Sequence, residues 1–271
     1  MKLSDFDYQL SEQFVAQYPL KKRDHSRLMV VRRTTKEIVH DYFFNIEKYI
    51  PPQSVFIVND SKVVPARLFG RMEQSGRAVE VFLLKALEGG YRYEALLRPL
   101  RKVKYGEKII FDGTALFAKL VDHQKKIIEF NKKDVTAYLK KIGHMPLPPY
   151  IRRDDEPSDR EDYQTVYAKN LGSVAAPTAG LHFTKGLLKK LKASGHRFGK
   201  VTLHVNYGTF RPVQEADIRN HQMHHEEYAM TKVVANMIQK IKEAKQKIIG
   251  VGTTSCRVLE TYARTGELGG S

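Results

Sequence analysis

The spacing of hydrophobic residues changes along this chain, and the changes divide it into three regions. Up to about residue 58, apolar runs at 28–31 and 55–58 predict two strands, and residues 12–17 are expected to form a short helix. Between about 60 and 145 the apolar runs are short, and turns containing glycine or aspartate separate them. Such spacing is typical of a small barrel or sandwich. The strands expected in this middle region are residues 79–84, 91–97, 108–111, 116–121 and 126–130.

Helices and strands alternate from residue 160 onward. Three leucines between 187 and 191 form an apolar stripe with lysines on the opposite side, which predicts an amphipathic helix. A second helix is expected over 233–241, and strands are expected over 200–205 and 247–251. This alternation predicts a largely parallel sheet whose ligands bind at the carboxyl ends of the strands. The strand at 247–251 is short and apolar, so we expect it in the interior of that sheet.

The middle region and the last region are joined by a distinctive segment. Residues 135–142 are expected to form a short helix, and Pro146-Leu-Pro-Pro149 then predicts a stiff connector between domains. A chain of 271 residues has room for one large domain or two ordinary ones. Hydrophobic residues make up 42% of it, which is enough material for a core.

Charge and cysteine content narrow the class of protein. Lys and Arg total 46 against 30 acidic residues, and the net charge of +16 is the electrostatic footprint expected for binding a polyanion. Charged residues make up 28%, and no apolar run approaches the ~18 residues that a membrane span needs. The N-terminus lacks the apolar segment of a signal peptide, and the single cysteine, Cys256, excludes an intrachain disulfide. We therefore expect a cytoplasmic protein whose basic clusters contact phosphates.

Two loops rich in small residues, at 172–184 and 203–212, are the most informative segments. Glycine, alanine, serine and threonine let the backbone approach a ligand closely and leave N–H groups available. Thr184 is positioned as the N-cap of the helix that follows it, so the first loop leads into a helix N-terminus. An ordinary tight turn explains either loop alone, whereas the two together favour a binding site.

A third loop, Gly252-Thr253-Thr254, follows the strand expected at 247–251 and precedes a helix. Its N–H groups and the positive end of the helix favour an anion, either a phosphate or a carboxylate. The segment lacks the third glycine of a dinucleotide-binding fingerprint, and the chain has no P-loop pattern. A plain helix cap is an equally good explanation of this spacing.

Short motifs occur along nearly the whole chain. They are Ala16-Gln-Tyr-Pro-Leu20, Arg23-Asp24, Ser26-Arg-Leu28, Val58-Asn-Asp60, Pro65-Ala-Arg-Leu-Phe-Gly70, Ala95-Leu-Leu-Arg-Pro99, Pro146-Leu-Pro-Pro-Tyr-Ile151, Tyr163-Gln-Thr-Val-Tyr-Ala168, the loops at 172–184 and 203–212, His221-Gln-Met-His224 with Glu226, and Val251-Gly-Thr-Thr254 with Arg257. In this order they resemble the S-adenosylmethionine:tRNA ribosyltransferase-isomerases of queuosine biosynthesis. The set is specific, although each motif alone is weak.

The resemblance implies the α/β class, with a Rossmann-like open sheet domain interrupted by an inserted small β-barrel domain. The α/β domain would comprise residues 1–58 and 151–271, and the β-barrel domain residues 59–150. Members of the family continue for tens of residues past the motif at 251–254, whereas this chain stops at Ser271. We therefore expect a C-terminally incomplete α/β domain, in either a fragment or a shortened member of the family.

The resemblance also implies a reaction. S-adenosylmethionine would serve as co-substrate and ribosyl donor, with no metal, and adenine and methionine would leave. The acceptor would be 7-aminomethyl-7-deazaguanine at the wobble position of a tRNA with a GUN anticodon, bound by a monomer, and the product epoxyqueuosine-tRNA. A base must remove a proton next to the sulfonium, and the acceptor amine must be held close and unprotonated. The sequence offers histidines and carboxylates for the first task without ranking them.

Candidate residues for each task come from the motifs. Histidine titrates near neutrality and a carboxylate can hold its tautomer, although a lone histidine is more often part of a core. Catalytic roles are expected for His182, His204, His221, His224 and Glu226. Contacts to S-adenosylmethionine are expected from Thr178, Gly180, Phe183, Thr184, Gly208, Thr209, Phe210, Gly252, Thr253 and Thr254. Contacts to RNA are expected from Lys21, Lys22, Arg23, Arg67, Arg98 and Arg211.

Three alternative interpretations stay open. On a helix, His221 would share a face with His224 and with His225, and together with Glu226 they could bind a metal. The chain could instead be a tRNA-binding fragment without catalytic activity. An RNA methyltransferase is disfavoured, because no glycine-rich loop follows the first strand with an acidic residue ending the second.

Overall fold

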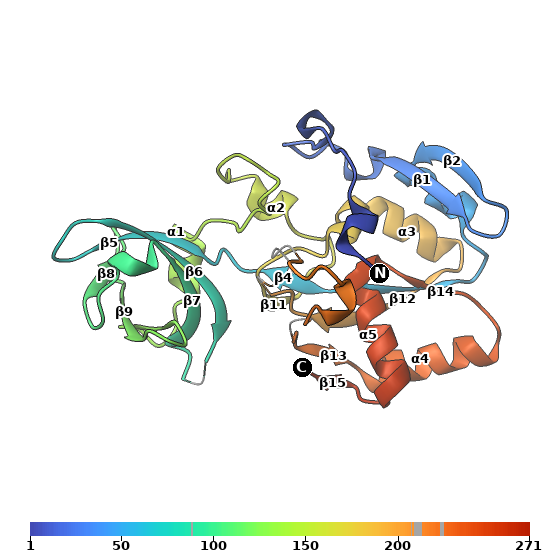
Figure 1. Ribbon diagram of the computed structural model, residues 1–271. Coiled ribbons are helices and arrows are strands. Elements are labelled where there is room, and N and C mark those ends of the chain that lie inside the picture. The colour runs from blue at the N-terminus through green and yellow to red at the C-terminus, as the bar shows by residue number, and fades with distance from the viewer. Residues whose placement is uncertain (88, 207, 209–212, 223–224) are drawn as a thin grey trace. The chain divides into compact units, whose positions relative to one another are not determined.

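The computed structural model of the chain describes residues 1–87, 89–206, 208, 213–222 and 225–271 (Figure 1). The contacts between residues divide it into two compact units. The larger unit comprises Met1–Lys62, Pro149–Arg153 and Glu161–Ser271, and the smaller one comprises Val63–Pro148 and Asp154–Arg160. The domain boundaries expected from the sequence, at 58/59 and 150/151, stay a prediction.

A five-stranded sheet forms the centre of the larger unit, with the strand order β14-β3-β12-β13-β15. Both β14 (Ile248–Gly250) and β12 (Arg197–Leu203) run parallel to β3 (Val55–Asn59). Next to them, β13 (Tyr228–Met230) and β15 (Gly269–Gly270) are antiparallel. The sheet is therefore mixed, and the expected parallel arrangement holds for its first three strands. All of β3 is buried, as its uninterrupted apolar run indicates.

The position of β14 differs from the sequence-based expectation, which was wrong. Among the described strands it lies at an edge of the sheet with β3 as its one neighbour, and its residues are half-buried. Its apolar residues are explained by packing above and below the sheet. Ile248 packs against the hydrophobic cluster on one face, and Ile249 packs against the cluster on the other.

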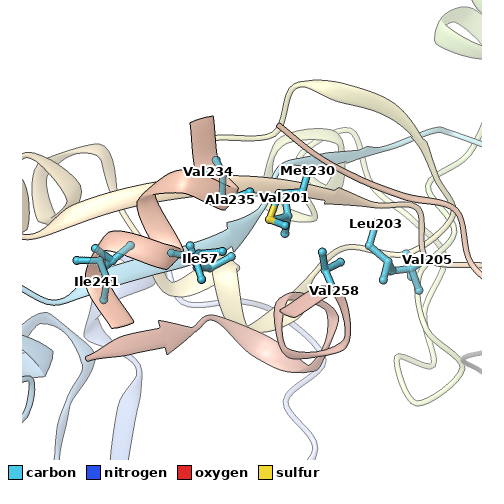
Figure 2. Packing of buried hydrophobic residues seen from close by; sticks show 12 residues of the cluster. Ile57, Val201, Leu203, Val205, Met230, Val234, Ala235, Ile241 and Val258 are labelled. Atoms are coloured by element: carbon cyan, nitrogen blue, oxygen red, sulfur yellow. The ribbon is translucent and has the colours of Figure 1, made fainter. Parts of the chain in front are cut away.

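Helices cover both faces of the sheet. The face that contains Val55 and Ile57 packs against α4 (Lys232–Glu243) and α5 (Gly252–Thr265), as Figure 2 shows. The opposite face, with Phe56 and Val58, packs against α3 (Lys185–Ala193) and the 3-10 helix η4 (Phe43–Tyr49). Because side chains alternate along β3, this one strand contributes to two apolar cores.

Shorter elements complete the larger unit. An antiparallel hairpin is formed by β1 (Arg27–Arg32) and β2 (Glu37–Tyr42), and β4 (Ser61–Val63) pairs with β11 (Asn170–Ser173). The short helices are η1 (Leu3–Phe6), η2 (Glu12–Phe14), η3 (Arg23–His25), η6 (Thr178–His182) and η8 (Ile218–Asn220). Another short helix, α2 (Asp159–Asp162), spans the boundary between the two units. The helix expected over 12–17 is thus only a 3-10 turn, and the Gln17 side chain donates to the carbonyls of Val15 and Tyr150 instead. Within the described residues, no helix has the length and hydropathy that crossing a membrane requires.

The smaller unit is a closed antiparallel barrel with the strand order β10-β7-β6-β5-β8-β9. Its elements are β5 (Arg67–Met72), β6 (Ala78–Ala86), β7 (Arg92–Arg98), η5 (Leu100–Lys102), β8 (Lys108–Ile110), β9 (Phe117–Asp122), β10 (Ile127–Phe130) and α1 (Thr136–Ile142). Leu68 and Met72 of β5 point into its core and are fully buried. The strand expected from the apolar pattern did not include β5, because Gly70 occupies an inward position and Phe69 an outward one, which breaks the apolar alternation. The inserted barrel and the layered open sheet confirm the predicted fold class.

Candidate functional site

The parallel strands bring the sequence motifs together at one edge of the sheet. Because β3, β12 and β14 run in the same direction, their carboxyl ends at Asn59, Leu203 and Gly250 meet there. His204 follows β12 directly, and α5 begins two residues after β14. This edge is the usual ligand-binding position of an open α/β sheet.

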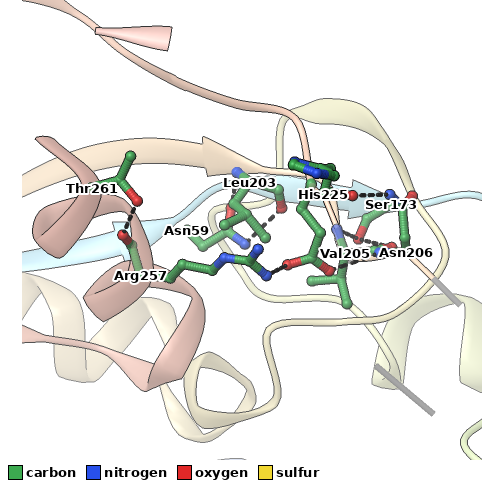
Figure 3. Close-up of polar contacts among 9 residues, drawn as sticks. Asn59, Ser173, Leu203, Val205, Asn206, His225, Arg257 and Thr261 are labelled. Atoms are coloured by element: carbon green, nitrogen blue, oxygen red, sulfur yellow. Dashed lines mark hydrogen bonds and ion pairs between the residues drawn. The ribbon is translucent and has the colours of Figure 1, made fainter. Parts of the chain in front are cut away.

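The loop at 172–184 lies along the same edge. Val174 donates its N–H to the carbonyl of Val205 (3.0 Å), and the Ser173 hydroxyl accepts from the N–H of Val205 (3.0 Å; Figure 3). Further along, η6 contacts α5, and a Cβ added to Gly252 would lie 3.1 Å from Cβ of Ala179. The two glycine-rich loops therefore contact each other, and the first of them also contacts the loop at 252–254.

Among the candidate histidines that the structure describes, His204 has the surroundings that best suit proton transfer. Its ring lies against Gly172, where an added Cβ would be 2.9 Å from Cε1 of His204. Its Nδ1 atom is buried and has no hydrogen-bond partner. Burial lowers the pKa of His204, and the carboxylates of Glu227 and Asp60 oppose this only in part. The ring is therefore neutral at neutral pH, with one nitrogen that the protein does not engage.

His182 has different surroundings. It ends η6 and packs against Phe43, with 5.3 Å between the ring centroids. Burial lowers the pKa of His182, while a hydrogen bond to the backbone of Arg23 raises it. Because this ring is engaged by the backbone, His182 is less available to a substrate than His204.

Buried polar atoms without a hydrogen-bond partner gather around this edge. Among the described side chains they belong to Ser61, Thr165, His196, His204, Thr254 and Ser255. Ser61 follows the end of β3, and Thr254 and Ser255 lie in the first turn of α5, whose N-cap residue Val251 provides no side-chain hydrogen bond. Thr165 lies beside Gly180 of η6, so His196 is the exception in this set. Since buried polar groups are normally paired, such a concentration indicates a ligand site.

Two residues at this edge were not selected from the sequence, although they belong to the motif at 58–60. Asn59 accepts from the N–H of Leu203 and donates to its carbonyl, both at 3.0 Å. Asp60 accepts from the hydroxyl of Thr202 (2.8 Å) and from the side-chain amide of Asn170 (2.9 Å). A polar pair directly after a fully apolar strand was the signal that could have identified them.

Glu226 is held between α5 and the loop after β12. It is buried, it pairs with Nη1 of Arg257 (2.5 Å), and it accepts from the N–H of Asn206 (3.1 Å; Figure 3). These contacts place Glu226 in a network with Arg257 and the loop after β12. That it also holds the tautomer of a histidine stays a prediction.

His221 and His225 do not share the face of a helix, on which the metal alternative depends. His221 caps the end of η8, and His225 is exposed and not helical, with its carbonyl accepting from the side chain of Asn206 (3.1 Å). In the described part of the chain, no three His, Cys, Asp or Glu side chains gather in a way that could hold a metal ion. His224 lies outside the described residues.

Two residues expected to contact the co-substrate have structural roles. Phe183 is 2% exposed and packs edge-on against Phe43 and Phe56, so its ring offers no free face for stacking. Thr184 is the N-cap of α3, as predicted. Its hydroxyl accepts from the N–H of Leu187 (3.0 Å) and donates to Asp24 (2.8 Å). Phe183 and Thr184 therefore anchor the end of the loop to the core and to α3.

The other expected contact residues have varied positions. Gly252 begins α5 with a φ of +80°, Thr253 and Thr178 are exposed, Gly180 is buried, and Gly208 is partly buried. Thr209, Phe210 and Arg211 lie outside the described residues.

The basic residues expected to contact RNA also differ among themselves. Lys21 and Lys22 are exposed. Arg23 donates to the carbonyls of Gln164 (2.5 Å) and Glu161 (2.6 Å), so it ties the N-terminal segment to the rest of its unit. In the barrel, Arg67 pairs with Glu80 and Arg98 ends β7 with an exposed side chain.

Comparisons with known proteins agree on one family. A family model described as "Queuosine biosynthesis protein" matches residues 3–269. The S-adenosylmethionine:tRNA ribosyltransferase-isomerase of Sulfurihydrogenibium sp. (strain YO3AOP1) is 45% identical over 271 residues, which are 100% of this chain and 80% of that protein. Its namesake from Thermoanaerobacter sp. (strain X514) is 46% identical over 97% of this chain and 77% of its own length. A crystal structure of an S-adenosylmethionine tRNA ribosyltransferase from Thermotoga maritima is 32% identical, with a TM-score of 0.47, over 97% of this chain and 75% of that one.

Proposed function

We propose, because this chain belongs to the family of queuosine biosynthesis proteins, that it is an S-adenosylmethionine-dependent tRNA ribosyltransferase-isomerase. It transfers the ribosyl group of S-adenosylmethionine to 7-aminomethyl-7-deazaguanine at the tRNA wobble position and isomerises it, which gives epoxyqueuosine-tRNA. Adenine and methionine are released. The observation that carries the proposal is the concentration of unpartnered buried polar atoms where the family motifs meet.

S-adenosylmethionine binds, in this proposal, at the carboxyl ends of β3, β12 and β14. The N-terminus of α5 receives the methionine carboxylate, because its N–H groups and its dipole favour an anion. Gly252 allows close approach, and the hydroxyl of Thr254 supplies a hydrogen bond that the protein leaves unused. Thr178 and Gly180 of η6 form the adjacent wall, together with Gly208 from the second loop. Thr209 and Phe210 lie outside the described residues and stay predicted contacts.

His204 is the proposed base for the proton next to the sulfonium. That proton is acidified by the adjacent positive charge, and a neutral imidazole can accept it. Because burial lowers its pKa, His204 stays neutral where an exposed histidine would already be partly protonated. Glu226 positions Arg257 beside the same loop, and His182 supports η6. The residues of the site also hold the acceptor amine close, which supplies part of the rate.

The RNA partner follows from the same proposal. A tRNA with a GUN anticodon carries the acceptor base, and the net charge of +16 attracts its phosphates. Lys21, Lys22 and Arg98 are exposed cations for this contact. We further propose that the protein acts as a monomer, without a metal, in the cytoplasm.

One assay separates this proposal from its alternatives. The purified chain is incubated with S-adenosylmethionine and a tRNA that carries the aminomethyl precursor, and the nucleosides are then examined by mass spectrometry. We expect free adenine and epoxyqueuosine. In a parallel reaction with S-adenosylmethionine labelled at its methyl group, transfer of the label to tRNA would identify a methyltransferase. Binding of tRNA without release of adenine would identify a binding fragment.

A further inference from the structure

A second cluster of aromatic and charged side chains lies on the barrel, at β5. Arg67 and His144 form a short antiparallel bridge, in which the N–H of His144 donates to the carbonyl of Arg67 (2.8 Å). Phe69 is two residues further along β5, so it shares a face with Arg67. Although the barrel has a well-filled apolar core, the Phe69 side chain is 49% exposed.

Two nitrogen-bearing side chains contact the exposed ring. The guanidinium carbon of Arg67 lies 5.2 Å from the centroid of the Phe69 ring. The imidazole of His144 lies edge-on to it, with 4.9 Å between centroids and an interplanar angle of 75°. The ring and its neighbours therefore form a compact unit on the surface of the barrel.

A less exposed carboxylate holds each nitrogen donor in place. Glu80 accepts from Nε of Arg67 (2.6 Å), and Asp155 pairs with Nδ1 of His144 (2.7 Å) while accepting the N–H of Met145 (2.8 Å). The carboxylate side chains are 18% and 10% exposed, against 32% for Arg67 and 44% for His144. The two carboxylates therefore orient the Arg67 guanidinium and the His144 imidazole, which remain accessible.

Stability alone gives little reason for this arrangement. Ion pairs at a surface contribute at most about 1 kcal/mol, and an exposed phenylalanine ring forgoes the benefit of burial. An oriented guanidinium and an oriented imidazole beside an exposed aromatic ring match what one nucleotide offers, a flat base and a phosphate.

We propose that Arg67, Phe69, Glu80, His144 and Asp155 form a platform for an unpaired nucleotide of the tRNA. The base stacks on Phe69, and the neighbouring phosphate accepts hydrogen bonds from Arg67 and His144. The inference rests on the proposed function, which supplies the RNA. A paired base is already stacked within its helix, so the platform selects a loop or end of the RNA over a duplex. Small barrels bind single strands through such exposed aromatic residues.

The test compares Phe69→Leu with Tyr105→Leu, a matched change in the same unit at a tyrosine that is 72% exposed. Dissociation constants are measured for a GUN-anticodon tRNA transcript, for a single-stranded oligonucleotide and for an RNA duplex. We expect Phe69→Leu to weaken binding of the first two about tenfold, as loss of one base–aromatic stack does, with no change for the duplex. Tyr105→Leu should leave all three unchanged. Equal affinities for wild type and Phe69→Leu, or equal losses in both variants, would overturn the platform.

Salt dependence and turnover complete the test. Arg67→Gln removes a phosphate contact, so its log–log salt slope should become shallower by about one unit, whereas Phe69→Leu should keep the slope of the wild type. With turnover measured by adenine release, Phe69→Leu should raise KM for tRNA and leave kcat and the KM for S-adenosylmethionine unchanged. A wild type that binds tRNA but releases no adenine would contradict the proposed function and leave the platform standing. A Phe69→Leu variant with the RNA affinities and the KM for tRNA of the wild type would contradict the platform and leave the proposed function standing.

Discussion

The two polar clusters of this molecule are built in opposite ways. At the carboxyl edge of the sheet, Nδ1 of His204 and the hydroxyl of Thr254 are buried without a partner. On the barrel, Arg67 and His144 are accessible, and each is paired with a carboxylate. An unpartnered buried polar group costs about 1–3 kcal/mol, which a bound ligand can offset. The first arrangement suits a small molecule that is enclosed, and the second suits a polymer that touches the surface.

The strongest test of this comparison is to remove the proposed base. His204→Gln keeps a polar side chain near Gly172 but cannot accept a proton at neutral pH. We expect adenine release to fall by a factor of about 10²–10⁴, the usual contribution of general acid–base catalysis. The tRNA dissociation constant should stay the same, because the barrel cluster is untouched.

The matched control is His40→Gln, at an exposed histidine of β2, which should retain full turnover. Circular dichroism and a thermal melt establish that both variants fold. If folded His204→Gln keeps more than half of the wild-type rate, His204 is a packing residue and the base lies elsewhere.

The next largest effect is expected at the start of α5. In Gly252→Ala the new Cβ would lie 3.1 Å from Ala179, at a φ of +80° that other residues rarely adopt. Because such strain costs about 1–3 kcal/mol, we expect affinity for S-adenosylmethionine to fall about tenfold, while tRNA affinity stays constant.

Gly266→Ala is the control for this variant. Gly266 ends the same helix with a φ of +72°, and an added Cβ would meet nothing within 4 Å. It therefore carries similar backbone strain without the contact at η6. Calorimetry that shows equal loss of S-adenosylmethionine binding in both variants would mean that helix stability, and not the pocket, is being measured.

Sequence patterns predicted the parts of this fold that depend on local periodicity. The apolar run of β3 and the N-cap at Thr184 were both read correctly. The predictions were wrong where the position of an element depends on its neighbours in space. The run at 247–251 looks like an interior strand, yet β14 is an edge strand whose residues are covered from above and below. Apolar content does not reveal strand order, because an edge strand that is covered by side chains on both faces of the sheet is as apolar as an interior strand.

The candidate site shows the same limit at single residues. The motifs identified the loops that meet, but they did not separate residues that are exposed at the carboxyl ends of the strands from residues that are packed behind them. Phe183 and Thr184 adjoin His182 in sequence, yet one lies in the aromatic core and the other caps a helix. The position of Asp60 after an apolar strand marks it as a candidate, but its hydrogen bond from Thr202 depends on a distant segment that no local pattern shows. Such distinctions depend on contacts between segments more than 100 residues apart.

A smaller effect is expected from the N-terminal basic cluster, which tests whether RNA contact extends beyond the barrel. Arg23 is left intact, because its guanidinium holds two backbone carbonyls. Replacing Lys21 and Lys22 with glutamine should weaken tRNA binding a few-fold and reduce the log–log salt slope by about 1.5 in total. The control replaces Lys240 and Lys242 of α4 with glutamine. This helix packs on one face of the sheet, whereas η4, which contacts the η3 turn that follows Lys22, packs on the opposite face. An unchanged slope in the first variant would show that Lys21 and Lys22 face away from the RNA.

The smallest effect concerns pH and belongs to the sheet edge alone. Burial lowers the pKa of His182 and of His204 below the ordinary value of 6.5. The unfolded chain therefore takes up protons at a higher pH than the folded protein does. Stability is fully present above pH 6.5 and decreases as the pH falls through the lowered pKa values.

The window between pH 6.5 and 4.5 isolates the contribution of the two histidines. The carboxyl of Glu47 has an ordinary pKa of 4.5, and a hydrogen bond from Ser194 is the main cause that lowers its pKa in the folded protein. Glu47 therefore loses its stabilising charge only below this window. Urea unfolding across the window should show a midpoint that decreases with pH in the wild type. The double variant His182→Gln, His204→Gln should show a smaller decrease, since glutamine does not titrate. Equal slopes for the two proteins would mean that these rings are as well solvated when folded as when unfolded. The contrast between an enclosed site on the sheet and an accessible one on the barrel would then lose its physical basis.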